Sequence, residues 1–113
     1  MTQLWNCGWL LASWWLLSTS LLAADLPDAW TTDWTAATKR AAQEDKPMFA
    51  VFSAAWCAPC QAMVKSIYPD DAVKTELQNW VPVYVDIDAL PAVAEKYKVT
   101  SLPTMIYLNA DQT

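Results

Sequence analysis

Charged, polar and apolar residues are distributed unevenly along the chain, and this separates a leader from a folded remainder. Residues 1–24 contain no charged side chain, whereas every Lys, Arg, Asp and Glu lies at or beyond Asp25. Beyond that point, apolar residues recur at helical spacing in some segments and form short continuous runs in others. The remainder, residues 25–113, is therefore expected to be one domain that mixes helices and strands.

Four segments of this remainder carry helix signals. Ser, Thr, Asp and Asn cap helices, Pro is tolerated in a first turn, and Pro disfavours helix in the residues before it. Together these signals predict helices from Thr32 or Asp33 to about Asp45, from about Cys57 to before Pro69, from Asp70 through Trp80, and from Pro91 through Tyr97.

Three short apolar runs are predicted to be strands. Met48–Phe52 is continuous, as in a strand that is covered on both faces. Val81–Val85 carries Pro82 near its start, which indicates a position at the edge of a sheet. Met105–Leu108 is the third run. Strands that alternate with helices favour an α/β fold with parallel strands and helical crossovers.

The leader has the composition of an export segment. The apolar run Trp9–Leu17, followed by small residues up to Ala24, resembles the central and cleavage regions of a secretory signal. Residues 4–24 are also long enough to span a bilayer as an uncleaved anchor, and a buried helix of the domain is a third, less favoured interpretation. The two favoured interpretations both predict an exported, periplasmic or otherwise extracytoplasmic domain, soluble or tethered to the membrane. Cys7 is assigned no function.

Composition excludes several classes of function. The net charge of −5 argues against nucleic acid as a partner, because phosphate binding needs clustered Lys and Arg. The chain has no His, which removes the usual general base and the commonest ligand of transition metals. Its single glycine, Gly8, rules out a glycine-rich phosphate loop. Sulfur and carboxylates are what remains for catalysis.

The candidate chemistry lies in the sequence Cys57–Ala58–Pro59–Cys60. Cysteines three apart at the start of a helix lie one turn apart on the same face. Backbone N–H groups and the helix dipole at that end favour a thiolate on Cys57, the form that attacks disulfides. Cys60, one turn inside the helix, should be less exposed and can resolve a mixed disulfide. Pro59 limits how far the two sulfurs can separate.

Three other interpretations of this pair stay open. A structural disulfide would close only a very small loop and would constrain the unfolded chain little. A metal site needs three or four ligands, and a chain with this pair and no His would need a second chain to bind zinc. Two buried thiols would be inert, although the flanking Trp56 and Pro59 are unlike ordinary core residues.

Two motifs resemble those of the thioredoxin-like family. Phe52–Cys60 is similar to the strand-to-helix junction of thioredoxins and keeps the Trp-Cys-x-Pro-Cys core, while Ser101–Thr104 is similar to their cis-proline segment. The lead-in from Trp34 to Pro47 and the Tyr68–Asp70 insertion look closer to the exported relatives. The resemblance covers about residues 30–110.

The resemblance implies a thioredoxin fold, with a central, mostly parallel sheet flanked by helices, and a thiol–disulfide oxidoreductase. Cys57 would be the nucleophile and Cys60 the resolving thiol, with no cofactor and no metal. The partners would be protein disulfides or dithiols, and a reductase outside the cytoplasm would also need a membrane electron donor.

The same resemblance implies a substrate groove beside the sulfurs. Trp56 would shelter the sulfurs, and Pro103 would be cis, so that the backbone of Leu102 can pair with an extended substrate segment. The substrate-binding residues would be Trp56, Ala58, Pro59, Leu102 and Pro103.

Two features depart from the family. Its buried acid, six residues before the first active-site cysteine, is replaced by Val51, and the Lys that often partners it by Tyr84. Proton transfer to the resolving thiol then has to use water or another group, such as Asp86. The sequence also stops at Thr113, before the family's final hairpin strand and C-terminal helix. We therefore expect a sequence truncated at its C-terminus.

Overall fold

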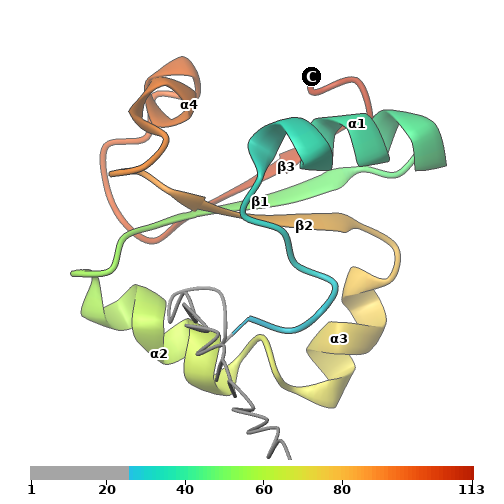
Figure 1. Ribbon diagram of the computed structural model, residues 1–113. Coiled ribbons are helices and arrows are strands. Elements are labelled where there is room, and N and C mark those ends of the chain that lie inside the picture. Colours follow the sequence, from blue (N-terminus) through green and yellow to red (C-terminus); the bar gives the residue numbers. More distant parts are fainter. Residues whose placement is uncertain (1–25) are drawn as a thin grey trace, which may run out of the picture.

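The computed structural model describes residues 26–113, in which a three-stranded sheet lies between two layers of helices (Figure 1). The predicted signal or anchor over residues 1–24 lies outside this part. Within it, no helix combines the length and apolar character needed to cross a membrane. The elements are α1 (Trp34–Glu44), β1 (Met48–Ser53), α2 (Ala58–Ser66), α3 (Asp71–Leu77), β2 (Val81–Asp86), α4 (Pro91–Lys96) and β3 (Thr104–Leu108).

Helices α1 and α3 begin at the predicted capping residues. Asp33 and Asp70 each accept a hydrogen bond from a first-turn N–H, at 3.0 and 2.9 Å respectively. Each bond satisfies a backbone donor that has no partner inside the helix. Helix α3 ends at Leu77, before the predicted end at Trp80, because the backbone tightens there: the Trp80 N–H donates to the Leu77 carbonyl three residues back, at 3.1 Å.

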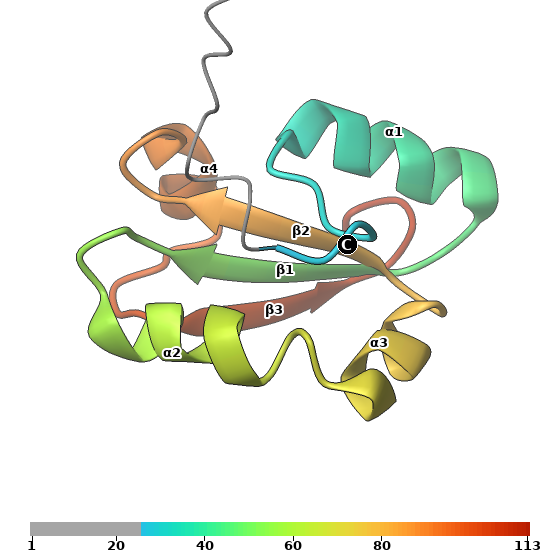
Figure 2. The ribbon, with the colours of Figure 1, turned by 60° about the horizontal axis from the view of Figure 1, so that its bottom comes forward.

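The sheet has the strand order β2–β1–β3. Strand β1 pairs with β2 in parallel and with β3 in antiparallel orientation. The α/β architecture is confirmed. The sheet is mixed, because β3 is antiparallel to β1, whereas the alternation of helices and strands had favoured parallel strands. The short helix α4 stays near the carboxyl end of β2 (Figure 2), so the chain enters β3 at the end of the sheet where β2 leaves it. Strand β3 must then run in the opposite direction.

Strand β1 is buried on both faces, as its continuous apolar run predicts. Met48, Ala50 and Phe52 pack in one core cluster with α1 and α4, while Phe49 and Val51 pack in a second cluster with α2 and α3. This division follows from the period of two in a strand. Figure 1 shows the two helical layers on opposite sides of the sheet.

The edge position predicted from Pro82 is confirmed for the three-stranded sheet. On the outer side of β2, away from β1, the only pairing among residues 26–113 is an isolated bridge that joins Thr31 to Val83. The Thr31 N–H donates to the Pro82 carbonyl at 3.3 Å, and the Tyr84 N–H donates to the Thr31 carbonyl at 2.9 Å. Pro82 has no N–H to offer on this side, so the pairing with the lead-in stays short.

Candidate functional site

The two cysteines lie where β1 leaves the sheet and α2 begins. Cys57 is the N-cap of α2, with φ −85° and ψ 101°, and Ala58 and Pro59 open the first turn. The Cys57 N–H donates to the Ala54 carbonyl at 3.1 Å, which closes the turn between strand and helix. The Cys60 N–H points back and donates to Cys57 Sγ at 3.3 Å. A thiolate on Cys57 would accept this hydrogen bond and would be stabilised by the positive end of the helix dipole.

Cys57 and Cys60 are joined in a disulfide, with their Cα atoms 5.3 Å apart. Cys57 is 5 % exposed and Cys60 2 %. This order agrees with the expectation that Cys60, inside the helix, is the less accessible sulfur. Both cysteines are buried, and Cys57 is the slightly more exposed of the two.

A groove of about 480 Å³ opens beside the first cysteine. Four of the five predicted substrate-binding residues, Trp56, Ala58, Pro59 and Leu102, line it. The fifth, Pro103, is not among the lining residues, but the Leu102–Pro103 peptide bond is cis, as expected. Residues 99–101 and Ile87 complete the wall. The structure thus brings the dithiol and the proline segment together, although they are far apart in the sequence.

The indole of Trp56 is held in place by a residue that the sequence analysis did not single out. Trp56 is 68 % exposed, yet its Nε1 donates to Asp88 Oδ2 at 3.0 Å. Asp88 follows the end of β2, and its own N–H donates to Asp86 Oδ1 at 2.8 Å. Since parallel neighbours end at the same edge of a sheet, the carboxylates after β2 could have been expected near the end of β1. Asp86, proposed as a proton-transfer group, is half-buried in this turn.

A match to a known family shows where the chain belongs. The family model described as thioredoxin-like matches residues 29–110, which include both cysteines and the cis-proline segment. The chain belongs to the thioredoxin-like family. The fold expected from the two motifs is therefore confirmed.

Several thioredoxins resemble this chain. A thioredoxin of Echinococcus granulosus is 37% identical over 70 residues, which make up 62% of this chain and 63% of the relative. Thioredoxin H4 of Arabidopsis thaliana is 30% identical over 79 residues, or 70% of this chain and 65% of that protein. The crystal structure of a thioredoxin from Nicotiana alata has a TM-score of 0.59 at 26% identity, and the match covers 73% of this chain and 71% of that one. The chain spans less than two thirds of the length of the two curated relatives.

The layer beneath α2 contains the two positions at which the sequence departs from the thioredoxin pattern. Val51, which replaces the usual acid, is 1 % exposed and lies in register with Tyr84, which replaces the usual Lys. The Tyr84 hydroxyl is 2.6 Å from Ser53 Oγ, and Gln61 Nε2 donates to it at 3.3 Å. Ser53 is the only polar residue among residues 26–113 that is fully buried. The replaced pair was predicted from the sequence, whereas Ser53 and Gln61 were not.

A second tyrosine is buried in the same core cluster beneath α2. Tyr68, just after α2, is 2 % exposed, and its ring centroid lies 4.5 Å from that of Trp30. Burial, and to a lesser extent the neighbouring Tyr84, raises the pKa of Tyr68 to about 12. Its hydroxyl therefore keeps its proton at neutral pH. The layer where the resemblance implied a buried acid holds a valine, hydroxyl groups and an amide.

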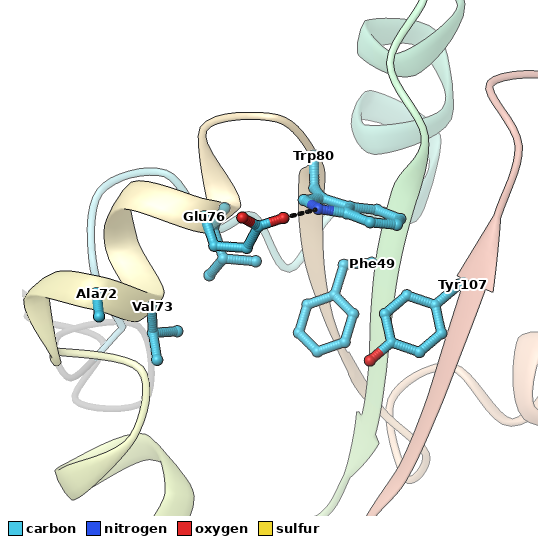
Figure 3. A pocket seen from close by; sticks show the side chains of 7 residues that line it. Phe49, Ala72, Val73, Glu76, Trp80 and Tyr107 are labelled. Atoms are coloured by element: carbon cyan, nitrogen blue, oxygen red, sulfur yellow. Dashed lines mark hydrogen bonds between the residues drawn. The ribbon is translucent and has the colours of Figure 1, made fainter.

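A second groove, also of about 480 Å³, lies at the other end of β1. It is formed by α3, Phe49 and Tyr107, and Figure 3 shows the two rings side by side. Their centroids are 5.2 Å apart, and Trp80 Nε1 donates to Glu76 Oε1 at 3.2 Å. Its lining is apolar apart from Glu76, Trp80 Nε1 and the Tyr107 hydroxyl, and it contains no sulfur. This groove therefore offers no group for disulfide exchange.

Proposed function

We propose that this protein is an exported thiol–disulfide oxidoreductase that exchanges disulfides with protein substrates through Cys57 and Cys60. The observation that carries the proposal is the bonded cysteine pair at the start of α2, beside a groove that contains the cis-proline segment. Membership of the thioredoxin-like family and the similarity to thioredoxins support it. The dithiol itself carries the electrons, so exchange requires no cofactor.

In the reduced protein, Cys57 is the attacking residue. Its thiolate attacks one sulfur of the substrate disulfide, a new S–S bond forms, and the other substrate sulfur leaves as a thiolate. The Cys60 N–H at 3.3 Å and the N-terminus of α2 stabilise the negative charge on Cys57 before the attack.

Cys60 then resolves the mixed disulfide. After it has released its proton, its thiolate attacks Cys57 Sγ, the Cys57–Cys60 bond forms, and the second substrate sulfur leaves. Two electrons have then passed from the dithiol to the substrate. The same steps in reverse oxidise a substrate dithiol, and the redox potential of the pair against that of the compartment sets the direction.

The groove supplies a place for the substrate chain. Trp56, Ala58, Pro59 and Leu102 form its apolar wall, and Pro103 holds the turn before β3. Among residues 26–113, no backbone hydrogen bond uses the N–H or the carbonyl of Leu102. A substrate segment in extended conformation can pair with these groups, as in the addition of a strand to a sheet edge.

The proposed location follows from the leader alone. The uncharged, apolar residues 1–24 are typical of a signal or an anchor, and either would place the domain outside the cytoplasm. Disulfide chemistry suits such a compartment. A reductase there would draw its electrons from a membrane partner.

Reduction of insulin by dithiothreitol tests the enzymatic proposal. We expect wild-type protein to accelerate it and Cys57→Ser to fall to the rate of dithiothreitol alone, because the attacking sulfur is lost. Cys7→Ser in the uncleaved chain, which removes a cysteine outside the pair, should keep the wild-type rate. Equal rates for wild type and Cys57→Ser would refute the proposal.

The alternative is a thioredoxin-fold binding module whose cysteines form a permanent disulfide or hold a metal ion. A permanent disulfide predicts a redox potential below about −300 mV, where structural disulfides usually lie. A metal-binding pair predicts stoichiometric zinc or copper in protein purified without oxygen. An exchange enzyme shows neither result.

A further inference from the structure

The polar contacts beneath α2 form one connected network. The Ser53 and Tyr84 oxygens are 2.6 Å apart, and Gln61 Nε2 donates both to the Tyr84 hydroxyl, at 3.3 Å, and to the Ala54 carbonyl, at 3.0 Å. The Ala54 carbonyl also accepts the Cys57 N–H at 3.1 Å. An unbroken path of hydrogen bonds therefore joins the middle of β2 to the backbone of the first cysteine.

The network occupies the layer in which the family's acid is missing. Val51 and Tyr84 are paired in the sheet, and Ser53 is the next residue of β1 on the same face. A buried hydroxyl without a partner is costly, so these groups hold one another in place. Gln61 directly follows Cys60, and Ala54 belongs to the same buried cluster as both cysteines. The network thus fixes the turn on both sides of the sulfurs.

We propose that Ser53, Tyr84 and Gln61 are positioning residues that hold the dithiol turn in its reactive geometry and set its redox potential. The Cys57–Cys60 bond itself closes the first turn of α2 in the oxidised protein. After reduction that covalent link is gone, and the bonds at the Ala54 carbonyl remain to hold the Cys57 N-cap. The network therefore stabilises the reduced form more than the oxidised form.

A redox potential separates this role from a general contribution to stability. The change in potential is proportional to the difference between the free energies that a substitution costs the reduced and the oxidised forms. A network that only stabilises the fold would cost both forms equally and would leave the potential unchanged. If the network instead holds the turn after reduction, removing the network destabilises the reduced form and makes the disulfide harder to reduce.

The test measures the dithiol–disulfide equilibrium in graded glutathione or dithiothreitol buffers, together with unfolding of each redox form. Tyr84→Phe removes the hydroxyl, and Gln61→Met removes both N–H donors at similar side-chain length. We expect each variant to favour the disulfide by threefold to tenfold, or about 15 to 30 mV toward more negative potential. Tyr107→Phe, which removes a hydroxyl from a 63 % exposed side chain on β3, should match wild type.

Two results would overturn the inference. One is a potential that in both network variants is unchanged, with equal losses of stability in the two redox forms, or less negative, with the larger loss in the oxidised form. The other is a shift in Tyr107→Phe as large as in Tyr84→Phe. The inference rests on the proposed redox role of the pair, but this measurement uses no protein substrate. It can therefore fail while the insulin assay succeeds, or succeed while that assay fails.

Discussion

Individual polar groups in this molecule differ in how well they are paired. Ser53 is fully buried, and its hydroxyl has a partner at 2.6 Å. The Tyr97 hydroxyl, in contrast, is buried without a hydrogen-bond partner among residues 26–113. Its ring packs on Trp34, with centroids 5.6 Å apart, and Lys96 Nζ lies 5.3 Å from the ring centroid. The ring of Tyr97 contributes to the core, whereas its oxygen opposes burial.

Removing that oxygen should therefore stabilise the protein. We expect Tyr97→Phe to raise the free energy of unfolding by about 1 kcal/mol, because the ring contacts stay and an unpaired buried hydroxyl is lost. Urea unfolding followed by circular dichroism measures the change. Tyr97→Leu serves as a comparison, since it loses the ring contacts and should be less stable than wild type. A loss of stability in Tyr97→Phe would mean that the hydroxyl has a partner.

The capping residues stabilise the first turns of α2 and α3. Cys57 caps α2 with its sulfur, and Asp70 caps α3 with a carboxylate that accepts N–H bonds at 2.9 and 3.4 Å. The acidic cap also complements the positive end of the helix. Helix α3 is short and contributes Leu77 to the core cluster beneath α2 and α3. A short helix depends strongly on its cap because few internal bonds hold it.

The cap of α3 can be tested separately from the dithiol. We expect Asp70→Ala to lower the free energy of unfolding by about 1 kcal/mol, because two backbone donors lose their acceptor. Asp70→Asn keeps an oxygen at the same position and should lose much less. Chemical denaturation of both variants gives the two values. Equal losses in Ala and Asn would show that charge, rather than the hydrogen bonds, is what the cap contributes.

The whole molecule is a sheet with one core cluster on each face, and β1 contributes to both clusters. The face beneath α2 and α3 contains the aromatic group of Trp30, Phe49 and Tyr68, and the dithiol lies at one end of the sheet. Because Tyr68 is inside this cluster, its ionisation is coupled to folding of the whole domain. Stability at alkaline pH therefore reports on this core.

Tyr68 should make the protein less stable as the solution becomes alkaline. Its pKa is about 12 in the folded protein and near 10 in the unfolded chain, so the unfolded state loses the proton first. The stabilisation is complete below pH 10 and is lost as the pH rises toward 12, at up to about 1.4 kcal/mol per pH unit. Unfolding measured from pH 9 to 12 should show a smaller slope in Tyr68→Phe. Identical slopes in wild type and Tyr68→Phe would contradict the raised pKa of Tyr68.

Much of the fold and of the site could be predicted from local signals. Caps, prolines and apolar runs predicted each helix and strand, and the spacing of Cys57 and Cys60, together with the flanking motifs, indicated a redox pair, which is bonded in the structure. The cis bond before Pro103 followed from the resemblance. These features depend on residues close together in the sequence or on motifs that carry their own geometry.

The sequence by itself determined the elements, the family and the sulfur pair, whereas the tertiary structure decided the direction of β3 and the groups that surround the pair. The bond between Trp56 and Asp88 joins residues 32 apart, and that between Ser53 and Tyr84 joins residues 31 apart. Capping and strand periodicity act over a few residues and contain no information about which side chains meet across the sheet. Strand register decides that, and it placed a hydroxyl network beneath the dithiol where the motif alone left an unexplained valine and tyrosine.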